Sequence, residues 1–222
     1  MKVSVVIPTL NEDDSIGHVL DKIPKVERYQ WEIIIVDGDS TDRTREIAEE
    51  KGARVIVEKR KGYGRAYKTG FAAATGDILV TLDGDDTYPA ERIPELVDYL
   101  IEKGLDFISC ERFTLMQEGA MGVTHKFGNM VLTLATRILF GVKIRDSQSG
   151  MWIFRREILK DLNLTSDGMP FSEEIKVEAW KKFRCEEVPI EYRERKGEVK
   201  LNTWEDGFRN LLFLLKKKLG RV

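Results

Sequence analysis

Hydrophobic and polar residues follow one another along the first hundred positions in short blocks. The apolar blocks predict buried strands, because a strand covered on both faces is hydrophobic throughout; they lie at residues 3–7, 33–36, 55–57 and 78–82. Helical patterns separate them, at residues 15–23, 41–51, 65–74 and 94–103. Ser40 or Thr41 is expected to cap the second helix. This rhythm predicts an α/β fold with a mostly parallel sheet flanked by helices.

The pattern becomes less regular after residue 105. Strands are expected at residues 106–109, 151–154 and 185–192, and helices at residues 128–140 and 172–183. Pro189 makes the strand at 185–192 an edge strand, because proline donates no hydrogen bond to a neighbouring strand. The sheet is therefore expected to be mixed at its edge.

The end of the chain predicts an amphipathic helix. Its apolar side chains fall on one face: Trp204, Phe208, Leu211, Leu212, Leu215 and Leu219. The first half of this helix is expected to pack on the domain, whereas its basic end, with Lys216–Lys218 and Arg221, is the better candidate for an anionic membrane. We therefore expect one domain over residues 1–200 and a basic amphipathic helix over residues 201–222.

Composition narrows the functional classes. The net charge of -2 gives no general basic excess, so no nucleic-acid partner is expected. Cys110 and Cys185 are too few for a disulfide framework, which favours a cytosolic compartment. The chain has two histidines, so a histidine-rich zinc site is not expected. Residues 1–8 are expected to form a strand and not a signal peptide, and no apolar run approaches the roughly 20 residues that span a bilayer.

Three carboxylates follow the apolar run at 78–82: Asp83, Asp85 and Asp86. Open α/β sheets bind ligands beyond the carboxyl ends of their strands, and carboxylates there can hold a hard divalent cation that neutralises a diphosphate. The alternative is a solvated turn, since Asp-Gly is ordinary turn chemistry.

Two further strand ends carry polar groups. Asp37 ends the strand at 33–36, where its carboxylate could accept hydrogen bonds from a base or ribose; Ser40 and Asp42 beside it are better explained as helix-capping residues. Residues 8–12 follow the first strand. Together the three strand ends predict a nucleotide-binding crevice.

Basic residues form the remaining candidate sites. The loop at residues 59–65 joins glycines to Lys and Arg ahead of a helix, which suits phosphate, although a plain exposed loop is equally consistent with it. The second half also carries isolated cations, more than half of which are expected to be merely solvated: Arg112, Lys126, Arg145, Arg193, Arg195 and Lys200.

The combination of motifs resembles glycosyltransferase family 2. The resemblance rests on Val-Ile-Pro-Thr-Leu-Asn-Glu at 6–12, Val-Asp-Gly-Asp-Ser-Thr-Asp at 36–42, Lys-Gly-Tyr-Gly-Arg-Ala at 61–66 and Leu-Asp-Gly-Asp at 82–85. Residues 145–151 and 187–197 are similar to the dolichol-phosphate mannose or glucose synthase branch. The resemblance implies the A-type glycosyltransferase fold, with a donor half at about 1–106 and an acceptor half at about 107–200.

The resemblance also implies residue roles. The nucleoside would be bound by Pro8, Leu10, Glu12 and Asp37, with Lys61, Gly64 and Asp83 nearby. Asp83 and Asp85 would form the Asp-x-Asp element that holds Mg²⁺ or Mn²⁺, with Asp85 the more direct ligand. The acceptor phosphate would be bound by Arg112, with Lys126 or His125, Arg195 and Lys200 as weaker candidates. Asp39, in a position often held by glycine, Thr87 and Val199 depart from the family pattern.

These roles predict an inverting transfer of mannose or glucose from a nucleotide diphosphate sugar to a polyprenyl (dolichyl) phosphate. A phosphate with a second pKa of about 6 is already a nucleophile at neutral pH and needs no general base. The enzyme is expected in the cytoplasm, peripheral on the cytoplasmic membrane face, with a possible membrane-protein partner. One alternative is transfer to a saccharide hydroxyl, with Glu173 or Glu174 as base; another is a non-catalytic nucleotide-binding module that docks on membranes.

Overall fold

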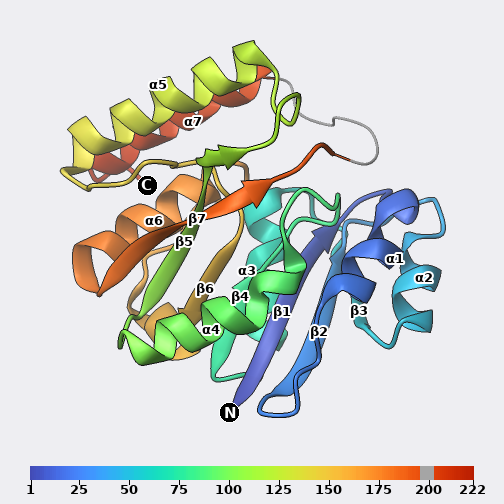
Figure 1. Ribbon diagram of the computed structural model, residues 1–222. Helices are drawn as coiled ribbons and strands as arrows, with labels where there is room; N and C mark the ends of the chain where they lie inside the picture. The colour runs from blue at the N-terminus through green and yellow to red at the C-terminus, as the bar shows by residue number, and fades with distance from the viewer. Residues whose placement is uncertain (196–202) are drawn as a thin grey trace.

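The computed structural model of the protein describes residues 1–195 and 203–222, and it confirms the α/β architecture (Figure 1). Seven strands form one sheet: β1 (Lys2–Thr9), β2 (Gln30–Asp37), β3 (Arg54–Val57), β4 (Ile78–Thr81), β5 (Phe107–Met116), β6 (Trp152–Arg155) and β7 (Cys185–Tyr192). The helices are α1 (Asp13–Lys22), α2 (Thr44–Glu50), α3 (Tyr63–Ala73), α4 (Ile93–Glu102), α5 (Val123–Phe140), α6 (Phe171–Lys182) and α7 (Thr203–Lys218). Short 3₁₀ turns lie at Ala90–Arg92 and Arg156–Asp161.

The strand order is β3-β2-β1-β4-β6-β5-β7. Strand β6 runs antiparallel to both of its neighbours, and the other pairings are parallel. The expected mixed sheet is therefore confirmed, and β7, which carries Pro189, lies at its edge. The carboxyl ends of β1, β2 and β4 consequently meet on one side of the sheet.

Two hydrophobic cores sandwich the sheet, because successive side chains of a strand point to opposite faces. Val5 and Ile7 of β1 pack into the core under α1, α2 and α4, whereas Val6 packs into the core under α3 and α6. Helices α5 and α7 pack against each other and lie beyond the ends of the strands (Figure 1).

The predicted cap of the second helix is wrong. Ser40 caps no helix: α2 begins at Thr44, and the Ser40 hydroxyl instead donates to Asp37 at 2.5 Å. Asp42 acts near this helix start, accepting from the Thr44 amide at 3.0 Å.

The face of α7 that packs on the domain is not the expected apolar face. Asn210, Leu214 and Lys217 face the domain and are buried, whereas Phe208 is 68% exposed. Lys217 points toward the domain because it forms buried ion pairs there: its Nζ lies 2.9 Å from Glu174 and 3.3 Å from Glu178. The leucine row of α7 is thus left on the surface, and Lys217 cannot serve the basic end as a membrane-binding group.

Candidate active site

A cleft of about 800 Å³ lies over the meeting point of the strand ends. Its floor is formed by the segments that follow β1, β2 and β4, as expected from the position of ligands in open α/β sheets. Its walls come from the loop before α3, from Arg112 on β5, and from the first turns of α5 and α7. Residues from both halves of the chain therefore surround one space.

Asp85 is buried in this cleft and fully engaged. Its Oδ1 accepts from the Thr87 amide at 3.1 Å and hydroxyl at 2.7 Å. Its Oδ2 accepts from Arg195, with Nε at 2.7 Å and Nη2 at 2.5 Å. Asp86 does not line the cleft and instead pairs with Lys22 at 2.6 Å, which fits a structural residue of the turn.

Asp83 lines the cleft beside Asp85. Burial, followed by the like charge of Asp85, raises the pKa of Asp83 to about 7. The Tyr63 hydroxyl lies 3.4 Å from Asp83 Oδ1. Among the described residues, no group of three His, Cys, Asp or Glu side chains is placed to hold a metal ion. Two carboxylates that repel each other are nevertheless a suitable partial set of oxygen ligands for a hard cation whose remaining ligands come from elsewhere.

Arg112, which also lines the cleft, is held by two hydrogen bonds. Its Nε and Nη2 donate to the two oxygens of buried Asp146 at 2.7 and 2.9 Å, and its guanidinium lies 5.2 Å from the centre of the Tyr192 ring. Burial alone would lower the pKa of Arg112, but the negative charge of Asp146 outweighs it and raises that pKa. Lys176 supports the same loop by donating to the Asp146 carbonyl at 2.8 Å.

His125 lines the cleft near Arg112 and Arg195. The pKa of His125 is lowered by its burial and then by the charges of Arg112 and Arg195, so its imidazole is neutral at pH 7. Arg112 and Arg195 thus carry the cationic character of this part of the cleft.

Most of the predicted site residues line the cleft: Pro8, Leu10, Glu12, Lys61, Asp83, Asp85, Arg112, His125 and Arg195. Asp37, Gly64 and Lys126 do not line it, and Lys200 lies outside the described residues. Asp37 is buried behind the floor, where it accepts from the Ser40 amide at 2.8 Å and from Thr9 at 3.1 Å. Lys126 is exposed on α5.

Gly64 has a packing function behind the wall. A Cβ at this position would lie 2.6 Å from the Ser166 carbonyl oxygen and 2.7 Å from Phe171 Cβ. Its lack of a side chain lets α3 approach the segment before α6, which positions Tyr63 against Asp83.

The candidate bases Glu173 and Glu174 do not line the cleft. Burial raises the pKa of Glu173 to about 8, and Gln148 donates a hydrogen bond to it. Glu174 accepts from the Thr165 amide at 3.0 Å and the Ser166 amide at 2.9 Å, and it pairs with Lys217.

Several cleft residues were not found from the sequence. Tyr63, Gln148 and Tyr192 line the cleft, and α7 adds Asp206 and Asn210. Gln148 links two of these elements, because Asn210 donates to its Oε1 at 3.1 Å. The motif at 145–151 gave a signal for this region without indicating the individual contacts.

Residues 4–162 match the sequence profile of glycosyl transferase family 2. The chain belongs to this family. It is a glycosyltransferase, and its sheet and flanking helices have the A-type fold implied by the resemblance.

Curated relatives sharpen this assignment. The chain is 38% identical over 205 residues to a dolichyl-phosphate hexose transferase of Haloferax volcanii, which covers 92% of this chain and 89% of the relative. It is 32% identical over 214 residues to a dolichol-phosphate mannosyltransferase of Pyrococcus furiosus, which covers 90% of this chain but 59% of that protein. The dolichol-phosphate synthase-like branch expected from the sequence is therefore confirmed.

A solved structure shares the fold. Glucosyl-3-phosphoglycerate synthase of Mycobacterium tuberculosis superposes with a TM-score of 0.81 at 26% identity, over 99% of this chain and 80% of that one. That protein was crystallised with Mn²⁺, uridine diphosphate and glucosyl-3-phosphoglycerate.

Proposed function

We propose that this glycosyltransferase moves a hexose, mannose or glucose, from a nucleotide diphosphate sugar to a polyprenyl phosphate, with inversion at the anomeric carbon. The observation that carries the proposal is the cleft itself, which Asp83 and Asp85 line together with Arg112 and Arg195. A diphosphate with its cation suits the acidic pair, and an acceptor phosphate suits the two arginines. The dolichyl-phosphate relative supports the acceptor class.

The donor side is suited to Mg²⁺ or Mn²⁺. Asp85 and Asp83 would hold the cation, and oxygens of the donor diphosphate would supply further ligands. A bound divalent cation would stabilise the charge that develops on the leaving nucleotide. Pro8, Leu10, Glu12 and Lys61 are proposed to line the nucleoside site, in the donor half at about 1–106.

Arg112 and Arg195 are proposed to position the acceptor phosphate. Arg112 is immobilised by Asp146, so it can orient a phosphate with little further loss of conformational freedom. A phosphate oxygen attacks the anomeric carbon without losing a proton, whereas a hydroxyl acceptor would need a carboxylate such as Glu173, which lies behind Gln148. The positions of Glu173 and Glu174 therefore favour the phosphate acceptor.

Two exposed apolar rows favour docking on a membrane. Phe127, Val131, Leu134 and Ile138 follow one another along α5, and the same spacing recurs in Phe208, Leu212 and Leu215 of α7 and in Leu219 directly after it. Phe127 is 64% and Ile138 73% exposed. Solvent-facing rows of this kind mark an interaction surface, and exposed cations on the same helices suit anionic lipids.

The acceptor lipid makes a membrane the fitting partner for these rows. We place the enzyme on the cytoplasmic face, with a membrane protein as a possible further partner. No helix within residues 1–195 and 203–222 is long and apolar enough to cross a membrane.

Membrane docking can be tested by sedimentation with vesicles of phosphatidylcholine and phosphatidylserine. The wild-type protein should sediment with the vesicles. A double variant that carries both Ile138→Asp and Phe208→Asp should remain in solution. Val57→Asp, at an exposed position of edge strand β3, is the matched control. Equal sedimentation of all three proteins would contradict the docking surface.

The catalytic assignment can be tested with a pair of adjacent substitutions. Asp85→Asn should abolish metal-dependent hexose transfer, because one proposed metal ligand loses its charge. Asp86→Asn should retain transfer, because Asp86 faces Lys22 and asparagine tolerates its positive φ of 64°. Activity of the Asp85 variant equal to that of the wild type would exclude the proposed role.

A further inference from the structure

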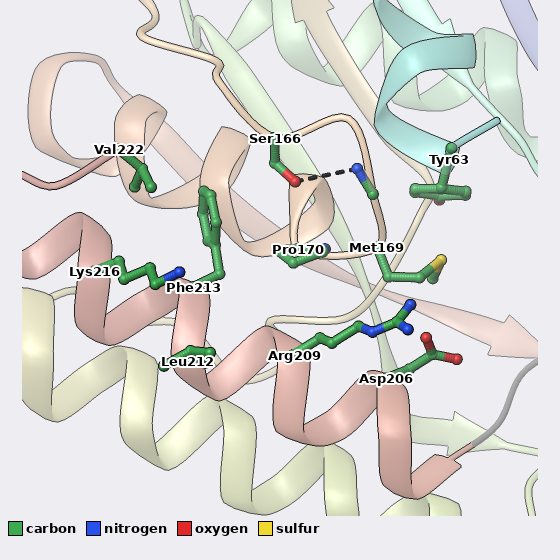
Figure 2. A pocket seen from close by; sticks show the side chains of 12 residues that line it. Tyr63, Ser166, Met169, Pro170, Asp206, Arg209, Leu212, Phe213, Lys216 and Val222 are labelled. Carbon is green, nitrogen blue, oxygen red and sulfur yellow. Dashed lines mark hydrogen bonds between the residues drawn. The ribbon is translucent and has the colours of Figure 1, made fainter. Parts of the chain in front are cut away.

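A second hollow, of about 490 Å³, lies along α7 beside the cleft (Figure 2). One wall is α7, and the other is the segment at 166–170 before α6. Gly62, Tyr63, Met169 and Asp206 line both the hollow and the cleft. The two spaces therefore adjoin one another, and Tyr63, whose hydroxyl lies 3.4 Å from Asp83, stands at the junction.

Hydrocarbon side chains dominate the middle of the hollow. Pro170, Leu212 and Phe213 line it, with Val222 at the end far from Tyr63 (Figure 2). Arg209 and Lys216 also line the hollow, and both are exposed, so their charges can remain in water at the rim. A sugar or nucleotide gains little from such walls, whereas an apolar chain gains in proportion to the area it removes from water.

The hollow also leads to the surface that is proposed to meet the membrane. Leu212 lines the hollow and belongs to the exposed apolar row of α7. A chain that left the cleft past Tyr63 would therefore follow α7 and emerge among side chains suited to lipid. The continuity with both the cleft and the apolar row points to one kind of occupant.

We propose that this hollow holds the first isoprene units of the acceptor lipid and guides the chain from the phosphate to the membrane face. The inference rests on the proposed function, since it assumes that the acceptor phosphate lies in the cleft. Phe213 is then a residue that determines specificity for an isoprenoid tail, although it contacts neither the sugar nor the phosphate.

A series of short soluble acceptors tests the hollow without a membrane. Geranyl, farnesyl and geranylgeranyl phosphate each differ by one isoprene unit. For the wild-type enzyme, KM should fall at least about tenfold from the shortest to the longest, because each added unit buries further apolar surface. Phe213→Gln should reduce this difference to about threefold or less. Phe208→Gln, on the same helix but outside the hollow, should keep the full difference.

Photo-crosslinking with a diazirine analogue of farnesyl phosphate locates the tail independently of turnover. Labelling of residues 166–170 or of residues 209–222 is expected. Transfer with the same chain-length dependence in Phe213→Gln, or labelling elsewhere, would overturn the inference. If none of the acceptors is glycosylated, the proposed function fails. The position of the photo-crosslinked peptide then shows by itself whether the hollow binds an isoprenoid.

Discussion

Replacing Arg195 with glutamine is expected to strengthen the binding of Mn²⁺ to the acidic pair. A carboxylate has about four lone-pair positions, and Asp85 already accepts four donors, two from Thr87 and two from Arg195. The Thr87 donors belong to the same turn, whereas Arg195 reaches Asp85 from the segment after β7 with a side chain that is 26% exposed. A cation that binds Asp85 must therefore displace Arg195 first.

The size of the effect follows from the exposure of the pair. A partly exposed ion pair contributes about 1 kcal/mol, so its removal should lower the dissociation constant for Mn²⁺ about fivefold. Isothermal titration of Mn²⁺ alone into each protein measures this directly. The same variant should show a raised KM for polyprenyl phosphate, because a cation on the acceptor side is lost.

Arg193→Gln is the matched control for this experiment. Arg193 pairs with Glu91 and Glu191 and does not line the cleft, so its replacement should leave Mn²⁺ binding unchanged. An Arg195→Gln protein that binds Mn²⁺ no more tightly than the wild type would refute the competition between the arginine and the cation.

Three further substitutions test the supports of the site by calorimetry. Asp146→Asn leaves Arg112 buried without a counter-charge, which should cost about 3 kcal/mol and lower Tm by about 6–12 °C; a change below about 2 °C would contradict this. Glu173 has a pKa of about 8 in the folded protein against an ordinary 4.5. The unfolded chain therefore loses this proton first, and the wild-type protein loses stability as pH rises from about 5 to 8. Glu173→Gln should reduce that loss, and an unchanged pH dependence of Tm would count against the buried acid. Gly64→Ala should destabilise by about 1–3 kcal/mol because its Cβ meets a carbonyl oxygen at 2.6 Å, whereas Gly207→Ala, with nothing within 4 Å, should not; equal Tm values would argue against the tight packing.

The order of elements and the floor of the cleft could be predicted from the sequence. Both depend on local patterns: continuous apolar runs define parallel strands, and the polar residues that follow them must gather at one edge. Asp83, Asp85 and Glu12 were found in this way. Asp37 was placed at the correct strand end, but the pattern could not show that Ser40 and Thr9 bind its carboxylate behind the floor.

The contacts between distant segments could not be predicted. Arg112 and Asp146 are 34 positions apart, and Asp85 and Arg195 are 110 apart, so no local spacing relates them. The amphipathic pattern of α7 showed that one face is apolar but not which face meets the domain. Buried ion pairs of Lys217 decide that orientation, and they leave Phe208 and its row outside.

The most direct test of the account is a choice of acceptor. Purified enzyme would receive a labelled nucleotide sugar, Mn²⁺ and three acceptors together: a long polyprenyl phosphate in vesicles, 3-phosphoglycerate, and a soluble oligosaccharide. Guanosine and uridine diphosphate donors of mannose and glucose would be compared. The account predicts label in the lipid fraction, lost in Asp85→Asn. Label found only in phosphoglycerate or in the oligosaccharide would contradict it.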